Sequence, residues 1–229
     1  LPPTEIRKGK ELFDYRSKYL PGLSRKITPI QIPNEQIENI LRECERLFYE
    51  LHFDVYARID GFINKKGKIF LNDPNTTSGM MPSSFFFHQA AEIGLNPSQF
   101  LTYIIRTSLQ KRFLNSGILG YKNLLNNLDE KIQNDKKANA SKTRVAVVLG
   151  GYSSERHISV ESGRNVFEKL SSSEKYSPFP VFLTGNNSKH ELYRIPINLM
   201  LKDNADDIKE KAEKYEVHDV VKKIMKSCE

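Results

Sequence analysis

Four polar residues near the middle of the chain suit metal and phosphate chemistry: Arg58, Asp60, Asp73 and Asn75. Arg58 and Asp60 are two residues apart in a β-rich run, so their side chains share one face of a strand. Mg²⁺ prefers carboxylate and amide oxygens, and a neighbouring arginine can hold an anion beside the metal. The set predicts a magnesium site that handles phosphate, with an ordinary surface Arg–Asp pair as the alternative.

A glycine- and hydroxyl-rich segment follows, from 76 to 84. The backbone N–H of Gly79, the hydroxyls of Ser83 and Ser84, and the start of the helix predicted after them can bind a carboxylate or an oxyanion. A capped loop without a ligand is the alternative.

A third motif, Gly150 to Arg156, follows an apolar strand and contains two glycines, two serines and Glu155. It does not follow the G-x-G-x-x-G pattern, and no acid stands at the ribose position, so we do not expect a nicotinamide site. Ordinary glycines that join a strand to a helix are the alternative.

The elements around these motifs follow from periodicity and turn residues. Two β-rich runs around the turn at 64–67 predict a hairpin that brings Asp73 and Asn75 to Asp60. Helices are predicted over 34–51, 83–93 and 96–114, the last two stopped by Gly94 and Gly117.

The second part of the chain has a different character. A polar stretch, 134–142, predicts a linker without regular structure. After it, a fully apolar strand at 144–149, a helix at 160–170 and a strand at 178–183 predict the start of a doubly wound βαβ domain.

The 229 residues carry a net charge of +7, of which +6 lies in residues 1–142. The basic residues alternate with acids, so nucleic-acid binding is not expected. Apolar runs are far too short to span a membrane and no signal peptide is evident, which predicts a cytoplasmic protein. Cys44 and Cys228 are expected to be free thiols there.

Both parts of the chain resemble D-alanine–D-alanine ligases, which are ATP-grasp enzymes. The segments similar to that family's carboxy-terminal part are 1–6, 13–19, 58–62 and 72–80 with Ser83 and Ser84, and 144–163 resembles its amino-terminal signature. The resemblance implies an α/β protein: an ATP-grasp carboxy-terminal α+β subdomain (1–125), a linker (126–142) and a Rossmann-like, pre-ATP-grasp βαβ domain (143–229).

In this family ATP phosphorylates the carboxylate of a first D-alanine, and the amine of a second attacks the acyl phosphate. The resemblance implies ATP and two Mg²⁺ ions as cofactors, with Mn²⁺ as an alternative. Asp60, Asp73 and Asn75 would ligate the metals, Lys18 would contact the transferred phosphate, and Tyr19 would lie on a closing loop.

The resemblance also implies roles in substrate binding. Arg58 and the Gly79 N–H would stabilise the tetrahedral oxyanion. Ser84 and the Phe85 N–H would hold the carboxylate of the second substrate, and Glu155 would pair with the ammonium of the first.

Three residues depart from the family pattern. Asp73 stands where the family usually has Glu, Ser78 replaces a proline, and Phe85 replaces a leucine. The shorter carboxylate weakens the case for bridging two metals. The other changes would shift preference towards another acceptor, such as D-lactate, or would mark a weak enzyme.

The order of the parts also departs from a complete ligase, because the carboxy-terminal part comes first and no segment resembles the central ATP-clasping subdomain or the family's His-Gly-x-x-Gly-Glu segment. A junction of two tandem ligase modules explains this order, with a circular permutant as the alternative.

The sequence thus predicts part of a ligase that forms a dipeptide for peptidoglycan, inactive as this isolated chain. The alternative is a non-catalytic scaffold or interaction module derived from a ligase. The expected partners are small molecules such as D-alanine, without nucleic acid or membrane. A homodimer and a domain-swapped assembly stay open.

Overall fold

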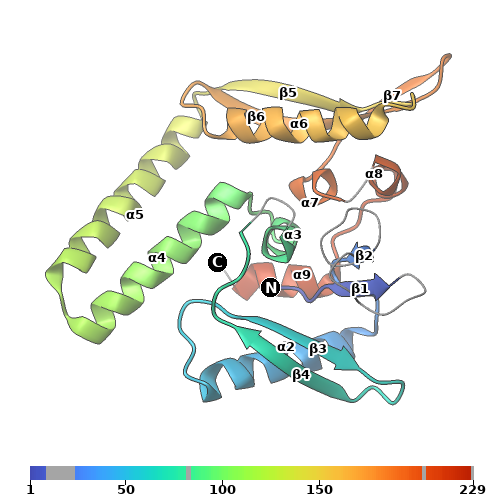
Figure 1. Ribbon diagram of the computed structural model, residues 1–229. Helices are drawn as coiled ribbons and strands as arrows, with labels where there is room; N and C mark the ends of the chain where they lie inside the picture. Colours follow the sequence, from blue (N-terminus) through green and yellow to red (C-terminus); the bar gives the residue numbers. More distant parts are fainter. Residues whose placement is uncertain (9–23, 81–83, 203–204, 228–229) are drawn as a thin grey trace. The chain divides into compact units, whose positions relative to one another are not determined.

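A computed structural model describes most of the chain (Figure 1). The described residues are 1–8, 24–80, 84–202 and 205–227. They fall into two compact units. The first contains Leu1–Arg7, Lys26–Glu130 and Val217–Glu229, and the second contains Lys8–Arg25 and Lys131–Glu216.

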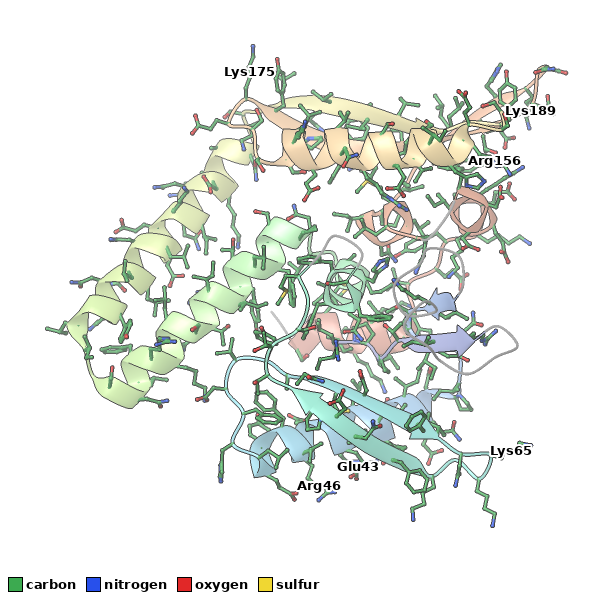
Figure 2. All side chains as sticks on the ribbon, in the orientation of Figure 1. Glu43, Arg46, Lys65, Arg156, Lys175 and Lys189 are labelled. Atoms are coloured by element: carbon green, nitrogen blue, oxygen red, sulfur yellow. The ribbon has the colours of Figure 1, made fainter. Side chains whose placement is uncertain are left out.

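Two small sheets precede helix α3 in the chain. Strands β1 (Glu5–Lys8) and β2 (Ser24–Ile27) pair with each other, and β3 (Arg58–Ile63) pairs antiparallel with β4 (Ile69–Asn75). At the tip of the second pair, where Lys65 is labelled in Figure 2, Asn64 Oδ1 accepts from the backbone N–H groups of Lys66 and Lys68. The predicted hairpin is confirmed, and an Asx-type turn closes it.

Helix α2 (Asn34–Glu50) is amphipathic, as its periodicity predicts, and its Ile37 is fully buried. On its exposed face Arg46 donates to Glu43 and Glu50, and Figure 2 labels the first pair. Cys44 is half-buried, and burial raises the pKa of its thiol. Cys228 lies outside the described residues.

Helices α3 (Phe85–Glu92) and α4 (Pro97–Ser116) pack through aromatic rings. The Phe86 ring stacks on Phe100, with 5.6 Å between centroids, and meets Tyr56 edge-on. The predicted stops are confirmed: Gly94 and Gly117 follow the two helices with φ of +87° and +67°, values that glycine adopts without strain.

The expected irregular structure of 134–142 is wrong for most of that stretch. Helix α5 (Leu119–Asn139) continues through it to Asn139, although the helix buries no residue. The reason is that neither glycine nor proline interrupts the chain after Gly120, and Lys136 and Lys137 lie in the last turn, where they favour the helix dipole.

The second unit contains the predicted βαβ element. Strand β5 (Thr143–Gly150) pairs parallel with β6 (Tyr176–Gly185), and α6 (Arg156–Ser171) connects them. Strand β7 (His190–Arg194) adds an antiparallel edge, and α7 (Ile197–Met200) and α8 (Ala205–Ala212) complete the core on the α6 face (Figure 1).

The apolar sequence of β5 predicts a strand that is buried on both faces, and this prediction is wrong. Val147 and Leu149 are buried, whereas Ala146 and Val148 are exposed. The reason is that the described helices of this unit pack on one face of the sheet. The alternation is that of a half-buried strand.

Helix α9 (Asp219–Ser227) packs on α2, with Lys223 Nζ donating to Glu38. Its contacts group it with the first compact unit. Within the described ranges, no helix combines the length and the apolar content needed to cross a bilayer.

Candidate functional site

The open end of hairpin β3–β4 carries the four residues predicted to bind metal and phosphate. Arg58 lies opposite Asn75, and Asp60 lies opposite Asn72. The register shifts between these pairs, which leaves Asp73 as the extra residue of a β-bulge, with φ of +48°. A bulge redirects a side chain and is frequent beside active sites. The hairpin therefore places Asp60, Asp73 and Asn75 within two or three register positions of one another along the paired strands.

The charged side chains at this end of the hairpin suit the binding of a metal cation and an anion side by side. Arg58 Nε lies 3.4 Å from Asp60 Oδ1, and the Arg58 side chain is 28% exposed against 45% for Asp60. Arg58 Nε is itself buried and donates no hydrogen bond within the described part of the chain. A buried donor without an acceptor is costly, so its position suits an incoming anion.

The amide of Asn75 is oriented by the bulge. Its Nδ2 donates to the backbone carbonyl of Asp73 at 2.8 Å, which leaves Asn75 Oδ1 as the atom able to ligate a metal. With the carboxylates of Asp60 and Asp73, the donors are hard oxygens that fit Mg²⁺ or Mn²⁺. Among the described residues, no group of three or more His, Cys, Asp or Glu side chains could hold a metal, so phosphate and water oxygens would complete the shell.

The start of α3 forms the second candidate region. Ser84 occupies the N-cap position with extended backbone, but its side chain makes no capping hydrogen bond. Its Oγ is buried and has no partner among the residues that the structure describes. Phe85 is the first helical residue, Gly79 is exposed with open space where a Cβ would be, and Ser83 lies outside the described residues. Unpartnered donors at a helix N-terminus suit a carboxylate.

The Gly150–Arg156 motif lies in the second unit, where Glu155 is the exposed N-cap residue of α6. Arg156, labelled in Figure 2, donates two hydrogen bonds to Asp206 at 2.9 and 3.0 Å. These bonds hold the pKa of the Asp206 carboxyl below its usual value. Arg156 therefore joins α6 to α8, a structural role that the sequence analysis did not predict.

The described site residues fall into two groups. Arg58, Asp60, Asp73, Asn75, Gly79, Ser84 and Phe85 belong to the first unit, and Glu155 belongs to the second. Two predicted site residues, Lys18 and Tyr19, lie outside the described residues. One residue that sequence reasoning missed is Lys26, whose Nζ lies 4.9 Å from the centroid of the Phe85 ring. A contact between positions so distant in sequence leaves no local signal.

Comparison with known proteins also divides the chain into two parts, although the second part includes α9. The family model described as "D-ala D-ala ligase C-terminus" matches residues 1–106, and the model "D-ala D-ala ligase N-terminus" matches residues 144–227. The D-alanine–D-alanine ligase of Bacillus cytotoxicus is 33% identical over 107 residues, covering 47% of this chain and 30% of the relative.

The corresponding protein of Halalkalibacterium halodurans is 33% identical over 116 residues, covering 48% of this chain and 37% of the relative. The D-alanine–D-alanine ligase of Leptospira biflexa is 34% identical over 109 residues, which cover 48% of this chain and 31% of the relative. The matched stretch thus spans about a third of these relatives' length. The two models describe the two ends of one enzyme, and together they cover most of the chain. The chain therefore belongs to the D-alanine–D-alanine ligase family and carries the family's carboxy-terminal part ahead of its amino-terminal part.

Proposed function

We propose that the chain is part of an ATP- and Mg²⁺-dependent ligase that joins D-alanine to a second D-alanine, or a similar acceptor, through an acyl phosphate for peptidoglycan synthesis. The observation that carries the proposal is the open end of hairpin β3–β4, where the register brings Arg58, Asp60, Asp73 and Asn75 within a few positions of one another at a bulge. Family membership supports the substrate class.

Asp60, Asp73 and Asn75 Oδ1 would hold Mg²⁺, which supplies charge neutralisation for the phosphates of ATP. Arg58 donates towards the oxygen that becomes negative as the acceptor amine attacks, and its buried Nε is available for that bond. The Gly79 N–H is the second donor, and the open space around Gly79 admits the substrate. Lys18 is proposed to contact the transferred phosphate, and Tyr19 to lie on the closing loop.

Ser84 Oγ and the Phe85 N–H would hold the carboxylate of the acceptor, because Ser84 Oγ has no partner among the described residues and Phe85 begins α3. Glu155 would pair with the ammonium group of the first substrate from the start of α6. These contacts position the attacking amine and the activated carboxyl group, and positioning contributes much of the rate of such reactions.

The most direct test of the metal site is a titration of the chain with Mn²⁺ followed by two-dimensional NMR. We expect paramagnetic broadening to begin at the backbone amides of Asp60, Asp73 and Asn75. Asp60→Asn should weaken the apparent affinity about tenfold, since one charged ligand is lost. Asp135→Asn, a change on the exposed face of α5, is the matched control and should bind as the unmodified chain does.

Broadening that is spread over the surface, or that is equal in Asp60→Asn and the unmodified chain, would refute the metal site. A second variant, Asp73→Glu, restores the residue usual in the family and should tighten Mn²⁺ binding if the longer carboxylate bridges two ions.

We also propose that the isolated chain is inactive, because no segment of it resembles the central ATP-clasping part of a ligase. An assay of ADP release should show no stimulation by D-alanine, and stimulation at the rate of a full ligase would contradict this. Calorimetric titration of the full-length parent protein with ATP and Mg²⁺ separates the alternative, because a parent protein that binds neither favours a non-catalytic scaffold.

A further inference from the structure

Helices α4 and α5 are joined by a short turn and form a helical hairpin (Figure 1). Three side-chain contacts lie at increasing distance from the turn, as antiparallel helices require: Lys122 with Phe113, Arg112 with Tyr121, and Arg106 with Asp129. The two family models match residues 1–106 and 144–227. The tip of the helical hairpin, residues 112–122, therefore lies in a segment that the family models do not cover.

The tip exposes three large apolar side chains around one turn of the chain. Leu114, Ile118 and Leu119 are 67%, 55% and 67% exposed. The turn between them is regular, since Gly117 caps α4 with φ of +67° and its N–H donates to the carbonyl of Phe113 at 2.8 Å. Single exposed apolar residues are common, but a group of them on an ordered turn indicates a contact surface.

The charge around these apolar residues has one sign. No acidic residue lies between Glu92 and Asp129, although the chain contains 28 acidic residues in 229. The same segment carries four basic residues, Arg106, Lys111, Arg112 and Lys122.

Two of these four basic residues have acidic partners, and the two at the tip do not. Arg106 donates to Asp129, and Lys111 lies 3.4 Å from Asp54. Arg112 and Lys122 make no ion pair within the part of the chain that the structure describes. Instead their cations lie 6.0 and 5.7 Å from the centroids of the two rings that face them across the helical hairpin. The tip is thus apolar and positively charged at once.

This combination favours an anionic lipid surface over a second copy of the chain. Two tips in contact would place uncompensated cations against each other, which costs free energy. A membrane surface supplies negative head groups for the cations and an apolar layer beneath them for the leucine and isoleucine side chains. The ring of Tyr121 beside Arg112 is of the type that is enriched at membrane–water interfaces.

We propose that the tip docks on the surface of a membrane that contains anionic phospholipids. Leu114, Ile118 and Leu119 enter the head-group region, and Arg112 and Lys122 bind lipid phosphates. This contact is independent of the proposed ligase chemistry. Composition predicted no membrane partner because no apolar run can span a bilayer, but an interfacial contact does not require such a run.

The test is flotation of the whole chain with lipid vesicles in a density gradient. We expect the chain to float with vesicles made of equal parts of phosphatidylglycerol and phosphatidylcholine, and not with vesicles of phosphatidylcholine alone. Binding should weaken as salt is added, because salt screens charges at the membrane surface. Flotation that is equal with both kinds of vesicle, or absent with both, would overturn the proposal.

Variants of the tip separate the apolar contribution from the charge. Leu119→Ser should lower the vesicle partition coefficient about fivefold, because one leucine side chain no longer leaves water. Lys122→Gln should lower it by about the same factor, and Lys122→Arg, which keeps the charge, should bind as the unmodified chain does.

Two matched controls lie outside the helical hairpin. Leu192→Ser replaces a leucine on β7 that is 63% exposed, and Lys175→Gln replaces an exposed lysine whose ammonium lies over the ring of Tyr176. Both should float as the unmodified chain does. All these side chains are exposed, and a well-dispersed NMR spectrum of each variant verifies that it is folded. Tip variants that float as well as the controls would refute the role of the tip.

The competing partner, a second copy of the chain, is tested by analytical ultracentrifugation without vesicles. We expect the molecular mass of the chain in solution to be the same with and without Leu119→Ser. A dimer that Leu119→Ser dissociates would assign the tip to self-association and overturn the membrane proposal.

Discussion

Replacing Gly163 by alanine should destabilise the βαβ unit, although alanine is the better helix former. Gly163 lies inside α6 where the helix crosses β5. A Cβ at this position would lie 2.6 Å from the Cβ of Leu149 and 3.1 Å from its Cδ2. The nearer atom is fixed to the backbone of β5, so the overlap is relieved only if α6 moves away from the sheet.

The expected magnitude follows from two opposed effects. Overpacking of a close contact costs about 1–3 kcal/mol, and the backbone position of the overlap favours the upper end. Alanine in place of glycine returns about 1 kcal/mol of helix propensity. The net expectation is a loss of about 1–2 kcal/mol in the free energy of unfolding of this unit. Gly120→Ala in α5 is the control: its Cβ would have one neighbour, at 3.8 Å, and it should be neutral or stabilising.

Native-state hydrogen exchange measures this locally, which matters because the chain has two units and a single unfolding transition is not assured. Exchange should accelerate at the amides of β5 and α6 in Gly163→Ala and not in the first unit. Leu149→Ala should not rescue the variant, because alanine keeps the Cβ that causes the overlap. Protection in Gly163→Ala equal to or above that of the unmodified chain would refute the close helix–strand contact. A displaced α6 would also move Glu155 at its start.

Three further predictions concern contacts between elements. Arg106 Nε donates to Asp129 at 2.7 Å and lowers the pKa of that carboxyl. The pair therefore stabilises the α4–α5 contact at pH values above the ordinary carboxyl pKa of about 4, and this stabilisation is lost as the pH falls through the lowered pKa. In Arg106→Met the pKa of Asp129, followed by NMR, should return to the ordinary range, and an unchanged titration midpoint would contradict this. Arg164→Met should destabilise the second unit by about 1–3 kcal/mol in urea unfolding, because the guanidinium donates to the backbone carbonyls of Met200, at the end of α7, and of Lys202 beyond it. A change below about 0.5 kcal/mol, the level of a surface substitution, would argue against that role. Asn96→Ala should cost about 1 kcal/mol by removing the capping box of α4, seen as faster hydrogen exchange in its first turn, and unchanged exchange there would show that the cap is dispensable.

Much of the fold could be predicted where the signal is local. The β-rich runs around the turn at 64–67 and the helices ended by Gly94 and Gly117 depend on periodicity and on backbone preferences of single residues. The prediction failed at α5, because a polar and exposed stretch was taken as irregular although nothing in it interrupts a helix. The contact between α9 and α2 could not be predicted from the sequence, because it depends on packing between distant segments.

The candidate site shows the same division. The acids and the amide at Asp60, Asp73 and Asn75 were found because a hairpin relates their positions through simple register. The positions of Lys18 and Tyr19 remain predictions.

By itself, the sequence determined the family, the order of its two parts and the residue types of the candidate site, since motifs and short-range periodicity are written along the chain. Only the tertiary structure decided that Asp73 occupies a bulge, that Arg156 is bonded to Asp206, and that Lys26 lies over Phe85. The physical reason is that these features depend on strand register and on side chains brought together across long sequence separations, where the contact energy appears only once the chain has folded.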